Sequence, residues 1–139
     1  MLRKAPMAGA LVLGLAGAAS AQAGSFDENK MIKAVEALRE KHRIANVCMY
    51  LQPHTDQLIL DGWKNEVRKG ADWLNVEHAS KPFALRYIEA VDVRKLQPGD
   101  MSLAAARSLC EKNPTVVQDY LAFAFPTMPD VMQQVKDGK

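Results

Sequence analysis

Six of the seven prolines follow residue 50, and they limit the length of any regular element in that part of the chain. A proline lacks the amide hydrogen that a helix interior or a central strand requires, so it favours turns and the first turn of a helix. Between the prolines, apolar residues such as Ile59, Trp63 and Val67 recur at helical spacing. The sequence therefore predicts an all-α or mostly α fold, a small bundle of five or six short helices.

The first helical boundaries follow from caps and breaks. The first helix is expected to begin at a capping box that starts at Ser25 and to run to about Arg43. A second region is expected to open near Ala45 and to break at Pro53. The next helix spans residues 56–69, with Gly70 as a left-handed stop.

The remaining boundaries are set by serines and prolines. Residues 80–93 begin with a helix cap but also suit a strand, and we favour the helix. Ser102 is expected to cap the following helix. Asn113 and Pro114 are expected to begin another helix that Pro126 ends.

The chain has two cysteines, Cys48 and Cys110. In an oxidising compartment such a pair is expected to form one intramolecular disulfide, which for a loop of this length stabilises the fold by about 4 kcal/mol. Two free thiols are the alternative. A redox-active pair is disfavoured, because no Cys-x-x-Cys spacing holds the sulfur atoms together locally.

Residues 1–23 have the three parts of a secretory signal. Arg3 and Lys4 form a cationic start, residues 7–19 carry no charge, and residues 21–23 (Ala-Gln-Ala) offer a small-residue cleavage pattern. The apolar run is shorter than the roughly 20 residues of a membrane-spanning helix, so we expect a cleaved signal peptide and no membrane anchor. The sequence thus predicts export to a bacterial periplasm and a single helical domain over residues 24–139.

The charge balance disfavours nucleic acid as a partner. The chain has 18 basic and 16 acidic residues, and removal of Arg3 and Lys4 with the signal leaves the two signs equal. No stripe of Lys and Arg alternates with aromatic residues, as a surface that follows a phosphate backbone requires. We therefore expect no nucleic-acid partner.

His42, His54 and His78 lie in different segments, and none has a second metal ligand at helical spacing. We interpret them as solvent-facing or helix-cap residues and expect neither a metal nor another cofactor. The sequence has no nucleophile elbow and no phosphate-binding glycine loop. We therefore expect that the protein is not an enzyme.

Residues 121–126 (Leu-Ala-Phe-Ala-Phe-Pro) carry more apolar surface than one helix face can bury. One interpretation is that the large side chains nearby fill the core. The other is a surface that packs in a dimer or binds client proteins, with Trp63, Tyr120, Phe123 and Phe125 as its candidate residues.

Two stretches around the cysteines share their layout with a known family. The first is residues 48–51 (Cys-Met-Tyr-Leu), followed by Gly62-Trp63 and Gly70. The second runs from residues 91–93 (Val-Asp-Val) to residues 109–114 (Leu-Cys-Glu-Lys-Asn-Pro). In these stretches the chain resembles the HdeA/HdeB-like periplasmic acid-stress chaperones.

The resemblance implies a homodimer that binds no client at neutral pH and partly unfolds in acid, where it exposes apolar surface to unfolding proteins. The composition is compatible with this behaviour, since protonating 16 carboxylates and three histidines creates self-repulsion that loosens a small bundle. The first functional hypothesis is therefore an exported, acid-activated chaperone.

A second hypothesis is an immunity or inhibitor protein that binds one exported toxin or cell-wall hydrolase. Small exported bundles such as type VI amidase immunity proteins are similar in layout. A protein of this kind presents a preformed surface to one partner at neutral pH, whereas the chaperone binds many clients only in acid. A small structural or ligand-binding periplasmic protein is the third alternative.

Overall fold

The computed structural model describes residues 26–49 and 57–139, and these residues form helices without a strand. The expected all-α class is confirmed, and helix is also found in the ambiguous segment 80–93. Two of the helices, with 21 and 20 residues, are longer than expected. The α-helices are α2 (Glu28–Cys48), α3 (Gln57–Val76), α4 (Lys81–Ala90), α5 (Leu103–Glu111), α6 (Val116–Leu121) and α7 (Met128–Lys136), and a 3-10 helix, η2, covers Val93–Leu96.

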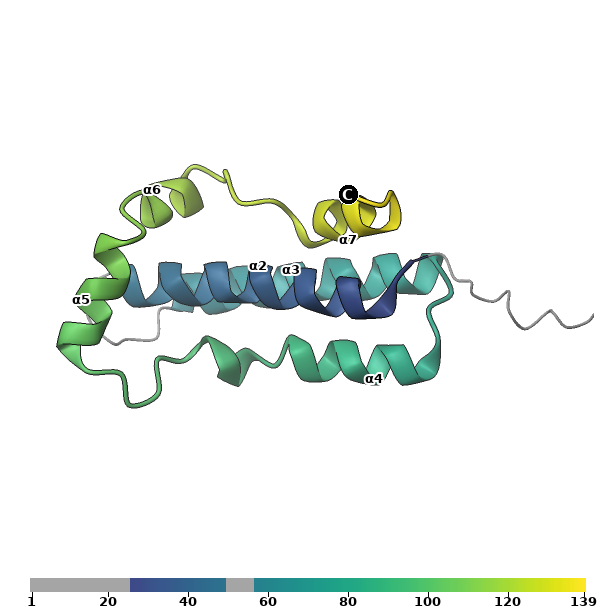
Figure 1. Ribbon diagram of the computed structural model, residues 1–139, viewed down its shortest axis with the longest axis horizontal. Helices are drawn as coiled ribbons and strands as arrows, with labels where there is room; N and C mark the ends of the chain where they lie inside the picture. Colours follow the sequence, from purple (N-terminus) through teal and green to yellow (C-terminus); the bar gives the residue numbers. More distant parts are fainter. Residues whose placement is uncertain (1–25, 50–56) are drawn as a thin grey trace, which may run out of the picture.

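The bundle is organised around α2. This helix runs beside α3 along the molecule, with α4 on one side of the pair and α7 on the other, while α5 and α6 cover one end (Figure 1). Every other element of the described chain contacts α2. Its first half packs in a large apolar cluster with α3, α4 and α7, and its last turn packs in a smaller cluster around the disulfide.

The expected break between Arg43 and Ala45 is wrong, because α2 continues to Cys48 without interruption. No proline or glycine between these positions stops the helix, and Ala45 to Cys48 are all buried. The tertiary contacts of this last turn therefore extend a helix that sequence reasoning had divided.

The first turn of α2 is capped by Asp27, whose carboxylate accepts a hydrogen bond from the Lys30 amide at 3.0 Å. An aspartate here also lies favourably at the positive end of the helix dipole. Ser25, which the sequence favoured as the start of the capping box, lies outside the described residues. The expected break at Pro53 lies outside them as well.

Gly70 does not end a helix, contrary to expectation, because α3 continues through it to Val76. Gly70 is buried, and a side chain there would overlap the Tyr87 hydroxyl and the Met128 side chain. The Tyr87 hydroxyl donates to the Val67 carbonyl at 2.8 Å, beside this glycine. The glycine is required for close packing rather than for a turn.

Ser80 caps α4 as expected, since its hydroxyl accepts from the Phe83 amide at 3.2 Å. The C-terminal end of α4 is fixed by side chains from three other elements. Each of these side chains donates one hydrogen bond to a carbonyl group that the end of the helix leaves without an internal donor. The bonds are Lys95 Nζ to the Glu89 carbonyl at 3.0 Å, Arg39 Nη1 to the Ala90 carbonyl at 2.7 Å, and Trp63 Nε1 to the Val91 carbonyl at 2.9 Å.

Ser102 caps α5 as expected, with its hydroxyl accepting from the Ala105 amide at 3.0 Å. The expected helix start at Asn113 is wrong. Its side-chain amide instead donates to the Leu109 carbonyl at 2.9 Å, behind the end of α5, and α6 begins only at Val116.

The helix that was expected to reach Pro126 ends five residues earlier, at Leu121. Phe123 has a φ of 57°, which ends the helix, and the Ala124 amide donates to the Asp119 carbonyl at 2.8 Å across the turn. This arrangement is a Schellman-type helix end with phenylalanine where glycine is usual. A loop then leads to α7, whose cap is Thr127.

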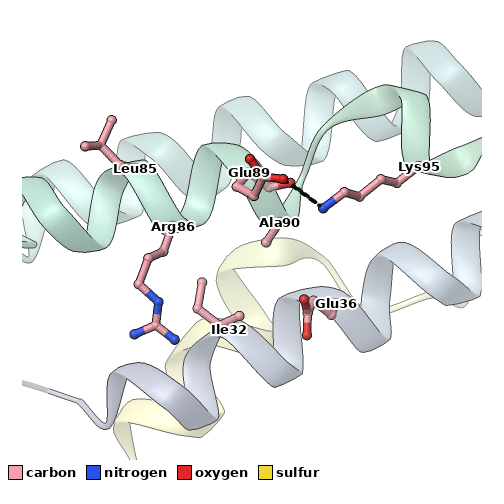
Figure 2. Close-up of a pocket in the computed structure, with 7 residues that line it drawn as sticks. All are labelled: Ile32, Glu36, Leu85, Arg86, Glu89, Ala90 and Lys95. Carbon is pink, nitrogen blue, oxygen red and sulfur yellow. Dashed lines mark hydrogen bonds and ion pairs between the residues drawn. The ribbon is translucent and has the colours of Figure 1, made fainter.

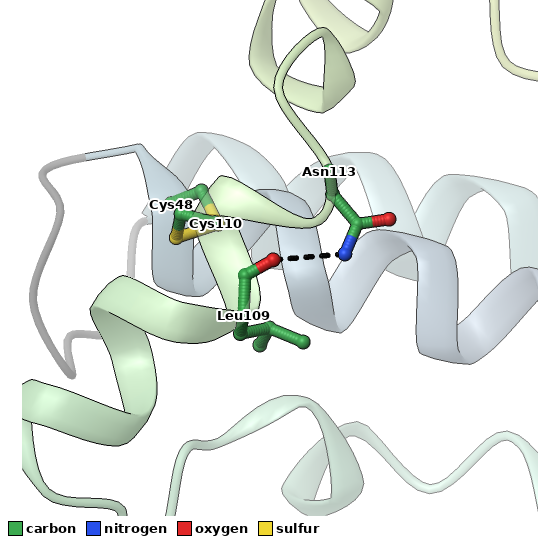
Figure 3. The surroundings of a disulfide bond; sticks show 4 residues. All are labelled: Cys48, Leu109, Cys110 and Asn113. Atoms are coloured by element: carbon green, nitrogen blue, oxygen red, sulfur yellow. Dashed lines mark hydrogen bonds between the residues drawn. A yellow bond between two sulfur atoms is a disulfide. The ribbon is translucent and has the colours of Figure 1, made fainter.

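Cys48 and Cys110 form the expected disulfide, with their Cα atoms 5.5 Å apart. The bond joins the last residue of α2 to the last turn of α5, near the Asn113 to Leu109 hydrogen bond (Figure 3). The buried side chains of α5 are Ala106 and Cys110, so the disulfide adds a covalent link to the short apolar contact that α5 makes with the bundle.

Candidate functional site

A cleft of about 520 Å³ lies between α3 and the segment that connects α6 to α7, with α2 beneath it. We call it the α3–α6 cleft. Most of its lining is apolar or aromatic, which is typical of a site that holds an apolar group of a partner. The lining residues are His42, Leu58, Asp61, Gly62, Asn65, Glu66, Lys69, Tyr120, Leu121, Phe123, Phe125, Pro126 and Thr127.

His42 lies in the floor of the α3–α6 cleft and is almost completely buried. Its Nδ1 atom lies 3.0 Å from the Leu38 carbonyl, one turn back in α2. Three aromatic rings surround the imidazole, with centroid distances of 4.9 Å to Trp63, 5.7 Å to Tyr120 and 5.2 Å to Phe125. His42 therefore connects α2, α3 and the α6–α7 segment in one aromatic cluster.

Burial of the imidazole lowers the pKa of His42 from its ordinary value of 6.5, because the charged form loses hydration. The bond to the Leu38 carbonyl and the charge of Glu66 oppose this shift, while nearby Lys41 adds to it. His42 is therefore a neutral member of the aromatic cluster at neutral pH.

The wall of the cleft is formed by Tyr120, which packs on Gly62 of α3. Its hydroxyl donates to the Leu58 carbonyl at 3.4 Å, and a side chain at position 62 would overlap this hydroxyl. The rings of Tyr120 and Phe125 meet edge to face at 5.4 Å, and Lys41 lies 5.0 Å from the centre of the Phe125 ring. These contacts hold the α6–α7 segment against α2 and α3.

The rim of the cleft exposes three large apolar side chains. Leu58 of α3 is 57% exposed, Leu121 of α6 is 52% exposed, and Phe123 is 93% exposed. Phe123 also has the left-handed backbone conformation, which for a bulky side chain costs of the order of 1 kcal/mol. A strained backbone thus presents an aromatic ring to solvent beside an aromatic cleft.

One side of the cleft is polar. The Glu66 carboxylate accepts from the Met128 amide at 2.7 Å, at the start of α7, and forms an ion pair with Lys69 at 3.1 Å. Asp61 accepts from the Gln57 side chain at 2.7 Å. The Glu66 contact joins the start of α7 to α3 at the edge of the cleft.

The structure separates the four residues that the sequence proposed for a client or dimer surface. Tyr120, Phe123 and Phe125 gather at the α3–α6 cleft, but Trp63 does not belong to the surface of the folded protein. Trp63 is fully buried and its indole nitrogen donates to the Val91 carbonyl. Its helical spacing with Ile59 already placed it on the inward face, so the periodicity was the better guide.

Sequence reasoning missed His42 as part of the site and interpreted it as a solvent-facing or cap residue, which is wrong for the folded chain. The available signal was its spacing, since His42 follows Leu38 by four residues on the buried stripe of α2. His78 is exposed after the end of α3, with a φ of 57°. His54 lies outside the described residues.

In the part of the chain that the structure describes, no group of three or more His, Cys, Asp or Glu residues is arranged to hold a metal ion. None of the helices described there combines the length and the apolar character needed to cross a membrane. Comparison with protein-family models, with curated proteins and with solved structures finds no match for this chain.

Proposed function

We propose that this chain is an exported protein-binding module of the inhibitor or immunity class, which seats an apolar segment of one partner in the α3–α6 cleft. The observation that carries the proposal is the exposure of Phe123 beside Leu121 and Leu58, all three at the rim of one cleft. Exposed aromatic anchors beside a pocket are typical of the centre of a protein interface.

The geometry supports binding by the folded state. The left-handed conformation of Phe123 is held by the turn that ends α6, and the cleft walls are held by Tyr120 on Gly62 and by Glu66 on the Met128 amide. A surface that is already ordered loses little conformational entropy on binding. Such a surface favours one partner at neutral pH, an exported toxin or cell-wall hydrolase, over a set of clients in acid.

Photo-crosslinking from position 123 tests this function. Phe123 is replaced by a benzophenone-bearing phenylalanine, and the oxidised protein is irradiated at pH 7 in a periplasmic extract. We expect one covalent adduct of discrete mass. The control carries the same probe at Gln134, an exposed position on α7 that does not line the cleft. Equal yields from the two positions would contradict the proposal.

A second candidate function, acid-activated binding of unfolding clients, is favoured by His42. This residue joins Trp63, Tyr120 and Phe125 in the aromatic cluster, and its pKa is lowered by burial. Acid therefore forces a charge into the contact between the α6–α7 segment and the two long helices. Loss of that contact would expose aromatic surface to clients.

Light scattering separates the two candidates. An acid-labile bystander protein is held at pH 2 to 3 and at pH 7 with the oxidised chain, and an apolar dye is read in parallel. Suppressed aggregation and dye uptake only in acid would favour the chaperone. A discrete adduct at pH 7 without any suppression in acid would favour the inhibitor.

A further inference from the structure

α4 has large apolar side chains on two opposite faces. Phe83 and Tyr87 are buried in the larger apolar cluster, whereas Leu85 and Ile88 are 61% and 62% exposed. Figure 2 shows Leu85 pointing away from α2, on the outer side of the bundle. A helix that is apolar on both faces is typical of a helix that is covered on both sides.

The charges on the outer side of α4 run against the helix dipole. Lys81 is the first residue of α4 and Glu89 is the last but one, so the cation lies at the positive end of the dipole and the carboxylate at the negative end. The Lys95 ammonium group of η2 lies 3.5 Å from the Glu89 carboxylate, but the Glu89 side chain remains 80% exposed. Within one copy of the chain, both charges are placed unfavourably with respect to the dipole.

A second copy of α4 places favourable partners opposite the charges of Lys81 and Glu89. Lys81, Leu85 and Glu89 are spaced by four residues and therefore lie on one face of the helix. If two such helices pack antiparallel about a two-fold axis at Leu85, Lys81 of each copy lies opposite Glu89 of the other. Each Lys81 then also meets the negative end of the second dipole, and each Glu89 meets the positive end.

A groove beside this face offers room for side chains of the second copy. It has a volume of about 370 Å³ and lies between α2 and α4, with Ile32 and Ala90 at its base (Figure 2). Arg86 points toward α2, where it donates to the Asn29 side chain at 2.9 Å, and so leaves the outer face to Leu85 and Ile88.

We propose that the outer face of α4, formed by Lys81, Leu85, Ile88 and Glu89, is the interface of a two-fold homodimer. The occupant of this face is a second copy because the face is complementary to itself: two apolar residues lie between charges of opposite sign. This interface is separate from the α3–α6 cleft, so dimerisation leaves the cleft open to a different partner.

Sedimentation equilibrium of the oxidised protein tests the interface. We expect a dimer, and we expect Leu85→Asp to weaken self-association by at least roughly tenfold, because a buried apolar anchor is replaced by a charge. The matched control is Leu121→Asp, another exposed leucine on a helix but at the cleft rim. A monomeric wild-type protein would overturn the proposal, and so would loss of the dimer in the Leu121 variant.

Charge exchange tests the two-fold geometry. Lys81→Glu and Glu89→Lys each place like charges opposite one another and should each weaken self-association, while the double variant should restore it. Each single change places its charge favourably for the dipole of its own helix, but Glu89→Lys also removes the ion pair with Lys95, so the fold of each variant is checked directly. Circular dichroism checks this point. A double variant no tighter than the single variants would contradict the antiparallel arrangement.

Discussion

Two tyrosines pack on two glycines of α3, and the two contacts have different surroundings. Tyr87 is buried, lies on Gly70 and donates to the Val67 carbonyl at 2.8 Å. Tyr120 is only half-buried, lies on Gly62 and donates at a longer distance, 3.4 Å. The same local arrangement thus closes a core at one end of α3 and borders a cleft at the other.

The difference follows from what covers each tyrosine. Tyr87 lies in the larger apolar cluster beneath α7, where Met128 also packs on Gly70, and burial raises the pKa of Tyr87 far above its ordinary value. Tyr120 packs on the smaller cluster, which includes Val116 of the six-residue α6 and the disulfide between α2 and α5. Along α3, the end that borders the cleft is therefore the end with the smaller apolar cluster and the disulfide.

Removal of the disulfide should have the largest effect. The double variant Cys48→Ser, Cys110→Ser should lose about 4 kcal/mol of unfolding free energy, because a loop of 62 residues is no longer closed in the unfolded chain. Urea unfolding measures the loss. Amide hydrogen exchange should then be faster around Tyr120 than around Tyr87. Equal exchange rates in the two regions would show that the disulfide does not stabilise the Tyr120 end of α3 in particular.

Gly70→Ala should have the next largest effect. The added methyl group overlaps both the Tyr87 hydroxyl and the Met128 side chain, and overpacking of this kind costs about 3 kcal/mol. Replacing glycine in a helix returns about 1 kcal/mol, so the net loss should be about 2 kcal/mol. Urea unfolding of this variant beside the wild type measures it, and a variant as stable as the wild type would show that the Tyr87 end is not tightly packed.

Acid should destabilise the fold through His42. Its pKa is lowered in the folded state, so below about pH 6.5 the unfolded chain binds a proton that the folded chain resists. The unfolding free energy should therefore fall as the pH drops through and below 6.5. His42→Gln should make this pH dependence shallower. His78→Gln, at an exposed site, is the matched control. An identical profile for the wild type and both variants would show that His42 does not contribute to the acid sensitivity.

Gly62→Ala should have the smallest effect on stability, within about 1 kcal/mol of the wild type. The methyl group displaces Tyr120, but Tyr120 can move toward solvent, and the gain in helix propensity offsets part of the cost. Urea unfolding tests the stability. A loss as large as that of Gly70→Ala would show that the two ends of α3 are equally closed.

Periodicity and composition were sufficient to predict the all-α class, the disulfide and the caps at Ser80 and Ser102. They failed where a tertiary contact determines whether a helix continues or ends. A glycine after two basic residues, as at Gly70, is typical of a helix end. Only the packing of Tyr87 and Met128 shows why a glycine is needed inside this helix.

The candidate site was predicted in part. The apolar excess of residues 121–126 indicated a surface that includes Tyr120, Phe123 and Phe125, and these residues do lie together. The sequence did not indicate that Phe123 would end α6 in a left-handed conformation, since that position usually carries glycine. It also did not bring His42 to the cleft, because the ring contacts join segments about 80 residues apart.

We propose that the cleft wall formed by Tyr120 on Gly62 shapes a binding site for one protein partner at neutral pH. The most direct test is the yield of the photo-crosslinked adduct from position 123 at pH 7, compared between the wild-type background and Gly62→Ala. We predict a single adduct whose yield falls several-fold when Gly62 is replaced, while the fold remains stable. An adduct of unchanged yield in the Gly62→Ala background would contradict the claim.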